Sequence, residues 1–105
     1  MPQVDVKYSD DLKLKHNDLF DAIETTINTL DSSAGVCKSR AYPAIYYKHS
    51  HVLIEIWLLP KPHRDRQFTQ KLIEELQNTI KNCIPQHAYI SLRLSYTDEN
   101  YRTVE

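Results

Sequence analysis

The sequence lacks the long apolar runs of membrane proteins and the N-terminal pattern of secreted proteins, and it has few cysteines. It contains no apolar run close to the ~20 residues of a membrane-spanning helix, and its charged, strand-like N-terminus lacks the pattern of a signal peptide. Only two cysteines occur, Cys37 and Cys83, and their spacing is not that of a metal site. We therefore expect a soluble cytoplasmic protein in which both cysteines are buried apolar thiols rather than a disulfide.

An excess of charge of one sign is also absent. The 105 residues carry a formal net charge of -1 with a pI of about 6.5, so no general attraction draws the chain to nucleic acid or to an anionic membrane. Any basic site must therefore be local. His49 and His51 would supply half of a metal site, but no third ligand follows at a suitable spacing, and we expect no metal.

The chain begins with a segment in which apolar and polar residues alternate from Gln3 to Tyr8, the period-2 pattern of a half-buried strand. Pro2 shares the parity of the apolar residues and heads this strand, where its missing N–H costs no ladder hydrogen bond. If Met1 is removed, Pro2 becomes a secondary amine that can act as a base. If Met1 is retained, the same nitrogen is a non-basic amide.

Two segments have helical patterns. In the first, Ser9, Asp10 and Asp11 are suitable N-cap residues and predict a helix of roughly 18 residues. Its apolar stripe is Leu12, Phe20, Ile23, Ile27 and Leu30. Ser32-Ser33-Ala34-Gly35 ends this helix, and Gly35, the single glycine, is expected in a left-handed C-cap or turn.

The second helix is expected to begin at Asp65, which can cap it, and to end at Pro85. Its stripe is Phe68, Leu72, Leu76, Ile80 and Cys83 or Ile84. The helix follows a rigid basic loop that runs from Pro60 to Arg66. Arg66 lies in the first turn of this helix, where it could pair with Asp65.

The segment from Val36 to Tyr47 reads as a strand interrupted by Pro43, which indicates a bend or a sheet edge. Lys38, Arg40 and Tyr42 share one parity and would project from one face. They would present two cations and a phenol within a short span.

A nearly continuous apolar strand follows from His51 to Leu59, which predicts a central strand that is buried on both faces. Its one carboxylate, Glu55, either points into a site or pairs with a cation such as Arg93. If both faces of this strand are apolar, other copies of the chain would have to cover the face that the helices leave open.

The last strand alternates from Ala88 to Tyr96, and the polar tail 97–105 is either frayed or lies across a neighbouring subunit. The element order is therefore strand, helix, strand, strand, helix, strand. We expect one domain, 1–105, of α+β class. Two β-α-β halves, about 2–47 and 51–96, would form a four-stranded mixed sheet with two helices on one face.

Three segments carry a resemblance. They are Met-Pro-x-Val-x-Val-x-Tyr-Ser-Asp at Met1 to Asp10, Ala34-Gly35-Val36 followed by Lys38-Ser39-Arg40, and His63-Arg64-Asp65-Arg66-Gln67. Together they resemble the tautomerase superfamily, most closely its 5-carboxymethyl-2-hydroxymuconate isomerase branch. The resemblance implies a cofactor-independent homotrimer in which Pro2, after removal of Met1, is the acid/base catalyst. It also implies that Lys38, Arg40, Arg64 and Arg66 bind a small carboxylate substrate.

Chemistry supports these roles. A free α-amino group titrates near about 7.7 to 8.0, and desolvation together with nearby cations lowers that value. Such an amine can take a proton from an enol hydroxyl and return it to a carbon of the conjugated system. Arginine binds carboxylates in a bidentate manner and stabilises a dienolate. We therefore expect an isomerase that acts on an unsaturated 2-hydroxy or 2-oxo (di)carboxylic acid.

Two other interpretations remain open. The same element order occurs in ferredoxin-like domains that bind RNA or small ligands; the apolar segment His51 to Leu59 has no glycine, which argues against RNA and leaves a small-ligand domain. Alternatively, the chain has the tautomerase fold without the activity. Lys38 favours this, because the isomerase branch usually has arginine there.

Overall fold

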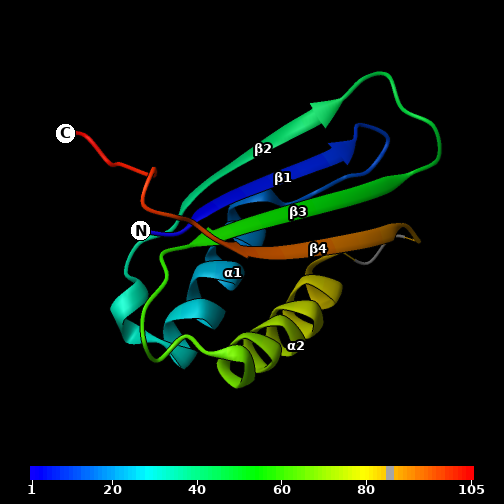
Figure 1. Cartoon of the computed structure of the whole chain (residues 1–105). Coiled ribbons are helices and arrows are strands. Elements are labelled where there is room, and N and C mark those ends of the chain that lie inside the picture. The colour runs from blue at the N-terminus through cyan, green and yellow to red at the C-terminus, as the bar shows by residue number, and fades with distance from the viewer. Residues whose placement is uncertain (85–86) are drawn as a thin grey trace.

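The computed structural model describes residues 1–84 and 87–105, and it contains a four-stranded sheet with two helices on one face (Figure 1). The elements are β1 (Gln3–Ser9), α1 (His16–Leu30), a 3-10 turn (Ser32–Ala34), β2 (Lys38–Ala44), β3 (His51–Leu58), α2 (Arg66–Cys83) and β4 (Tyr89–Tyr96). The strand order is β2-β1-β3-β4. β1 is parallel to β2 and antiparallel to β3, and β3 is parallel to β4. The predicted α+β fold with a mixed sheet is confirmed.

The core lies between the sheet and the helices. Val4 and Val6 of β1 and Ile54 and Ile56 of β3 are completely buried on the helix-facing side. The helices contribute Leu19, Ile23, Ile27, Leu72, Leu76 and Ile80. The apolar stripes predicted for the two helices therefore point to the core.

None of the described helices is long and apolar enough to cross a membrane.

The start of α1 differs from the prediction. The helix begins at His16, and Lys15 precedes it without a side-chain cap. Ser9 and Asp11 instead join the turn after β1 to the start of β3. The Ser9 hydroxyl accepts the His51 N–H at 3.0 Å, and the Asp11 carboxylate accepts a hydrogen bond from Ser50. Leu12 fits the helical stripe because it is buried, but it reaches the core from this turn.

The other predicted ends are confirmed where the structure describes them. Asp65 caps α2, because its carboxylate accepts the Phe68 N–H at 2.8 Å. Gly35 has a φ of 72°, as expected for a turn glycine, but it ends the 3-10 turn, whereas Asp31 is the C-cap of α1. β2, which contains Pro43, is an edge strand. The predicted role of Pro85 lies outside the described residues.

The prediction for β3 is half right. The strand is central, between β1 and β4. It is buried on one face only, however, because Leu53 and Glu55 on the other face are half-exposed and Trp57 is 39% exposed. The sequence predicted burial on both faces because Leu53 and Trp57, on the open face, are apolar. In the described part of a single chain both helices lie on the other face of the sheet, and no helix covers this open face (Figure 1).

Both cysteines are free and half-buried. Burial, and then the charge of Glu24, raises the pKa of the Cys37 thiol to about 11, while the positive N-terminal amino group lowers it in part. Burial also raises the pKa of Cys83. The two thiols are thus less buried than expected, and neither has the lowered pKa of a reactive cysteine.

Candidate active site

The open face of the sheet carries a row of charges with one residue from each strand. The strand register places Arg40 of β2, Asp5 of β1, Glu55 of β3 and Arg93 of β4 side by side. The two carboxylates lie next to each other, an arrangement that costs free energy unless cations offset it. Arg40 approaches Asp5, and the Lys7 ammonium lies 3.3 Å from Glu55. Glu55 is thus paired with a cation, as predicted, but with Lys7 instead of Arg93.

Arg40 is held in place by its neighbours. Its Nη1 donates to the Gln3 side chain at 2.8 Å and its Nε donates to the Tyr42 hydroxyl at 3.1 Å. Nε also lies 2.7 Å from Asp5 Oδ1, which offsets its charge. The predicted common face of Lys38, Arg40 and Tyr42 is confirmed by their register opposite successive outward residues of β1.

The Asp5 carboxylate keeps an unused acceptor. Although Oδ1 lies at ion-pair distance from Arg40, the N–H of Arg40 points to the Tyr42 hydroxyl. Among the described residues no hydrogen-bond donor satisfies this buried oxygen. A buried acceptor without a donor is costly, and the positive charge of Arg40 at 2.7 Å offsets that cost.

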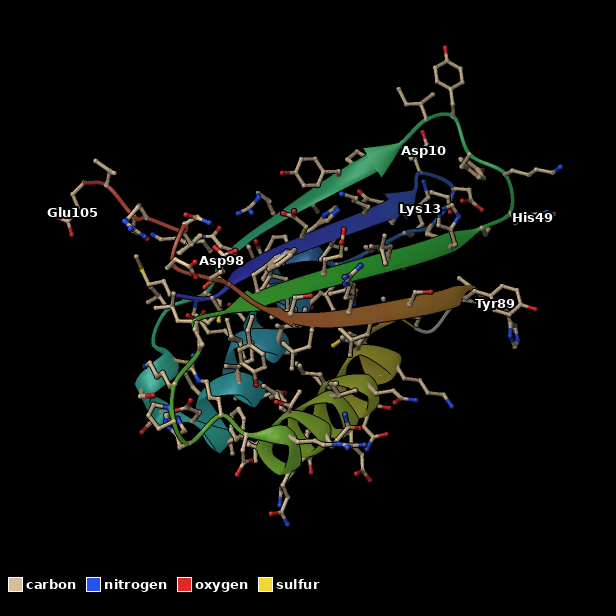
Figure 2. All side chains as sticks on the ribbon, viewed as in Figure 1. Asp10, Lys13, His49, Tyr89, Asp98 and Glu105 are labelled. Atoms are coloured by element: carbon tan, nitrogen blue, oxygen red, sulfur yellow. The ribbon has the colours of Figure 1, made fainter. Side chains whose placement is uncertain are left out.

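The segment that follows β4 forms one wall of a groove over this face. It leaves the sheet where the Thr97 N–H donates to the Leu58 carbonyl at 2.8 Å, and it is tied to β1 by the Gln3 amide, which donates to the Tyr101 hydroxyl at 3.1 Å. The groove measures about 690 Å³. The sheet side is lined by Gln3, Asp5, Arg40 and Trp57, and the other side by Thr97, Asp98, Asn100, Tyr101, Arg102 and Thr103. Figure 2 shows Asp98 where this segment crosses the end of the sheet.

The tail therefore folds over its own sheet in the single chain. The sequence predicted that it would fray or lie across a neighbouring subunit, but residues 97–103 reach the groove of the same chain.

Pro2 lies at the end of β1 beside this groove. It is buried on the helix-facing side, as its parity predicted, and its carbonyl accepts the Lys38 N–H at 2.8 Å. Its ring is not part of the groove wall, but the next residue, Gln3, is. Lys38 is exposed and lies outside the groove lining.

The second basic segment has a different environment. The Arg64 side chain is only 3% exposed, and its Nε lies 2.8 Å from Asp31 Oδ2. His63 lies 2.8 Å from the same oxygen, and Arg64 Nη1 donates to the Leu59 carbonyl at 2.7 Å. Arg64 thus joins the loop before α2 to the end of α1. Arg66 is exposed and, within residues 1–84 and 87–105, forms no ion pair with Asp65.

The structure thus brings one predicted residue, Arg40, into the groove wall and leaves Pro2 adjacent to it, while Arg64 and Arg66 lie on another segment. It adds Asp5, Trp57 and Tyr101. The alternation of β1 was a usable signal for Asp5, because it placed this residue on the polar side of the strand. The nearly continuous apolar run of β3 gave no such signal for Trp57. In the described part of the chain no three His, Cys, Asp or Glu side chains gather closely enough to hold a metal ion.

No protein-family model and no curated protein sequence matches the chain. Solved structures do match. A 5-carboxymethyl-2-hydroxymuconate delta-isomerase has a TM-score of 0.80 at 14% identity, over 100% of this chain and 88% of that chain. A 5-carboxymethyl-2-hydroxymuconate isomerase from Deinococcus radiodurans R1 has a TM-score of 0.75 at 15% identity, over 99% and 88%. A fused 4-OT symmetric trimer has a TM-score of 0.72 at 11% identity, over 98% and 93%. The chain thus has the fold of these isomerases and of 4-OT, which confirms at the level of fold the resemblance seen in the sequence.

Proposed function

We propose that the chain is a cofactor-independent tautomerase that moves a proton within a small unsaturated 2-hydroxy or 2-oxo (di)carboxylic acid. One observation carries the proposal. In a fold shared with two isomerases, Pro2 heads β1, one residue before Gln3 in the groove that contains Arg40. After removal of Met1 its nitrogen is the acid/base catalyst. The chain acts in the cytoplasm without a nucleic-acid or membrane partner.

The proton transfer needs no group beyond this amine. The neutral Pro2 nitrogen accepts the proton of the enol hydroxyl, and the oxygen forms the carbonyl as the electron pairs of the conjugated system shift along the chain. The terminal carbon then takes the proton back from the secondary ammonium. Charge develops on the substrate oxygen in the dienolate, and a fixed guanidinium stabilises it.

The groove supports the same class of substrate. Arg40 offers a cation that is held in a fixed orientation, and the Asp5 carboxylate in the groove wall offers a hydrogen-bond acceptor. A 2-hydroxy acid has a carboxylate for the first and a hydroxyl for the second. Trp57 supplies an apolar wall for the unsaturated chain. Of the other cations predicted to bind substrate, Lys38 and Arg66 are exposed and could reach a second carboxylate, whereas Arg64 would have to leave Asp31.

We also propose that the chain is a homotrimer. The fused 4-OT protein with the same fold is a symmetric trimer. The open, charged sheet face of the present chain fits a polar surface shared by subunits, because two adjacent carboxylates flanked by two arginines offer charges of both signs to a neighbouring copy.

The test combines a mass measurement with a rate. Intact mass of the protein purified from its native cells should show loss of Met1. Ketonisation of 5-carboxymethyl-2-hydroxymuconate, followed by loss of dienol absorbance, should then be about 10²- to 10⁴-fold slower for Pro2→Ala. Val104→Ser, at an exposed position outside the groove, is the matched control. A retained Met1 or equal rates for wild type and Pro2→Ala would contradict a catalytic proline.

A second candidate is a small-ligand-binding domain with this fold but without catalysis. The observation that favours it is that Asp5 already offsets Arg40 and Asp31 already pairs with Arg64. It predicts that calorimetric titration detects binding of an unsaturated dicarboxylate while no enol is consumed.

A further inference from the structure

The C-terminal segment 97–103 brings a second arginine to the groove. β1 is antiparallel to β3 and β3 is parallel to β4, so the end of β4 lies at the same end of the sheet as the start of β1. The segment that leaves β4 therefore passes the end of the sheet where Pro2 lies, and its residue Arg102 lines the same groove as Arg40. One guanidinium group thus comes from the sheet and one from the C-terminal segment.

The segment around Arg102 is folded into a turn, which limits where this side chain can lie. The Tyr101 N–H donates to the Asp98 carbonyl at 3.2 Å. The Asp98 carboxylate also lines the groove, but its Oδ1 accepts the Asn100 N–H at 2.9 Å. This carboxylate therefore stabilises the turn.

The Gln3 side chain connects the two walls of the groove. Its oxygen accepts a hydrogen bond from Arg40 at 2.8 Å, and its nitrogen donates to the Tyr101 hydroxyl at 3.1 Å. Arg102 follows Tyr101 directly, so the same amide holds Arg40 and the backbone that carries Arg102. A ligand that binds between walls held in this way loses less free energy to the ordering of side chains.

The charge of Arg102 is less neutralised than that of Arg40. Asp5 lies 2.7 Å from Arg40 Nε, whereas no carboxylate of the described residues lies within ion-pair distance of Arg102. Arg102 Nη1 donates to the carbonyls of Glu99 and Tyr101, and in the described part of the chain Nε and Nη2 have no partner. An arginine fork with two such N–H groups binds a carboxylate through two parallel hydrogen bonds.

The other cations considered for a substrate carboxylate do not share the groove with Arg40. Lys38 is exposed but lies outside the groove lining. Arg66 is the first residue of α2, on another segment. Within the described residues, Arg40 and Arg102 are the two cations that line this groove.

We propose that Arg102 binds the second carboxylate of a dicarboxylate substrate while Arg40 binds the first. The C-terminal segment then determines a preference for dicarboxylates over monocarboxylates. Arg102 takes no part in the proton transfer at Pro2, which leaves both carboxylates unchanged. The inference rests on the groove and the substrate class of the proposed function, and it assigns the second carboxylate to a residue.

Calorimetric titration with two probes that differ by one carboxylate tests this assignment. Hexanedioate has two carboxylates and hexanoate has one, on carbon chains of the same length. Wild type should bind hexanedioate more tightly than hexanoate. Arg102→Ala should weaken hexanedioate about tenfold, because it removes hydrogen bonds between charged groups, and should leave hexanoate within about twofold. Arg102→Lys should keep part of the preference, because lysine keeps the charge without the planar fork.

Lys13→Ala is the matched control for the loss of one positive charge. Lys13 is exposed, and Figure 2 shows it near the end of the sheet opposite to Asp98. Because salt screens a charge at that distance, this variant should leave both affinities within about twofold. Circular dichroism of Arg102→Ala should match that of wild type, because Arg102 is exposed.

The outcomes separate this inference from the proposed function. A wild type that binds hexanedioate no more tightly than hexanoate overturns the assignment, as does an Arg102→Ala variant that weakens both probes equally or neither. The probes are saturated and undergo no tautomerisation, so these results do not depend on catalysis. Selective loss of hexanedioate binding in Arg102→Ala, together with equal enol rates for wild type and Pro2→Ala, supports the assignment and argues against the tautomerase.

Discussion

Arg64 and Asp31 form a buried ion pair in which Arg64 Nε lies 2.8 Å from Asp31 Oδ2, and their side chains are 3% and 5% exposed. The pair connects the loop before α2 with the residue that ends α1. Ser33 donates to the other carboxylate oxygen through its backbone N–H at 3.0 Å. Two connections that are far apart in sequence are thus fixed by one carboxylate.

Removal of one partner of this pair should destabilise the protein strongly. Arg64→Ala leaves the Asp31 charge buried and without its buried cationic partner, and we expect a loss of ~3–5 kcal/mol in the free energy of unfolding. Arg66→Ala, at an exposed neighbouring position, should change it by less than ~0.5 kcal/mol. Urea unfolding of the two variants checks this, and similar values for both would mean that the buried pair contributes little.

Stability should also fall in acid because of Asp31. Burial raises the pKa of the Asp31 carboxyl, but hydrogen bonds from Ser33, His63 and Arg64 outweigh burial and hold the pKa well below its usual value. The unfolded chain, with a pKa near ~3.9, therefore binds this proton more readily than the folded chain. The contribution is fully present above about pH 5 and is lost as the pH falls below about 4 towards the folded pKa.

Urea unfolding between about pH 3 and pH 7 measures this contribution. Asp31→Asn should be less stable than wild type at neutral pH and should lose much of the acid slope. Part of the slope should remain, because the hydrogen bond from Ser50 lowers the pKa of Asp11 as well. An unchanged slope in Asp31→Asn would assign the acid sensitivity to other groups.

The fold was predictable because period-2 and helical patterns survive in short segments such as Gln3 to Tyr8. The start of α1 was not predictable, since Ser9 binds the first residue of β3 and Asp11 binds Ser50 of the β2–β3 connection, contacts that the local sequence does not reveal. The groove was not predictable either. It depends on the contact between Gln3 and Tyr101, which are 98 residues apart.

The two arginines of the second basic segment show the same limit. Arg64 and Arg66 look alike in sequence, and only the position of Asp31, 33 residues before Arg64, makes one of them buried and leaves the other exposed. Binding roles for both stay predictions.

Gly35 should not tolerate a side chain. Its φ of 72° with ψ of -154° is a conformation that residues other than glycine almost never adopt. A Cβ atom would meet nothing within 4 Å, so the cost comes from the backbone alone. We expect Gly35→Ala to lower the free energy of unfolding by ~1–3 kcal/mol, with Gly35→Asn no better. Thermal unfolding checks this, and an Asn variant as stable as wild type would indicate that the turn relaxes.

Arg40 and Asp5 should have opposite effects on the affinity for a carboxylate substrate. Arg40→Ala removes the guanidinium from the groove, and the KM of the proposed reaction should rise about tenfold, ~1.4 kcal/mol. The KM of Arg40→Lys should lie between those of wild type and Arg40→Ala, because lysine keeps the charge but lacks the planar guanidinium that bonds Gln3 and Tyr42 at once.

Asp5→Asn keeps the shape of the side chain and removes the charge that offsets Arg40. The KM should therefore fall, by about fivefold if the pair is worth ~1 kcal/mol. Steady-state kinetics with mono- and dicarboxylate substrates measure both effects. A higher KM for Asp5→Asn would contradict this prediction. It would mean that the Asp5 carboxylate contributes more as an acceptor for the substrate hydroxyl than it costs by offsetting the Arg40 charge, because the amide oxygen is a weaker acceptor than the carboxylate.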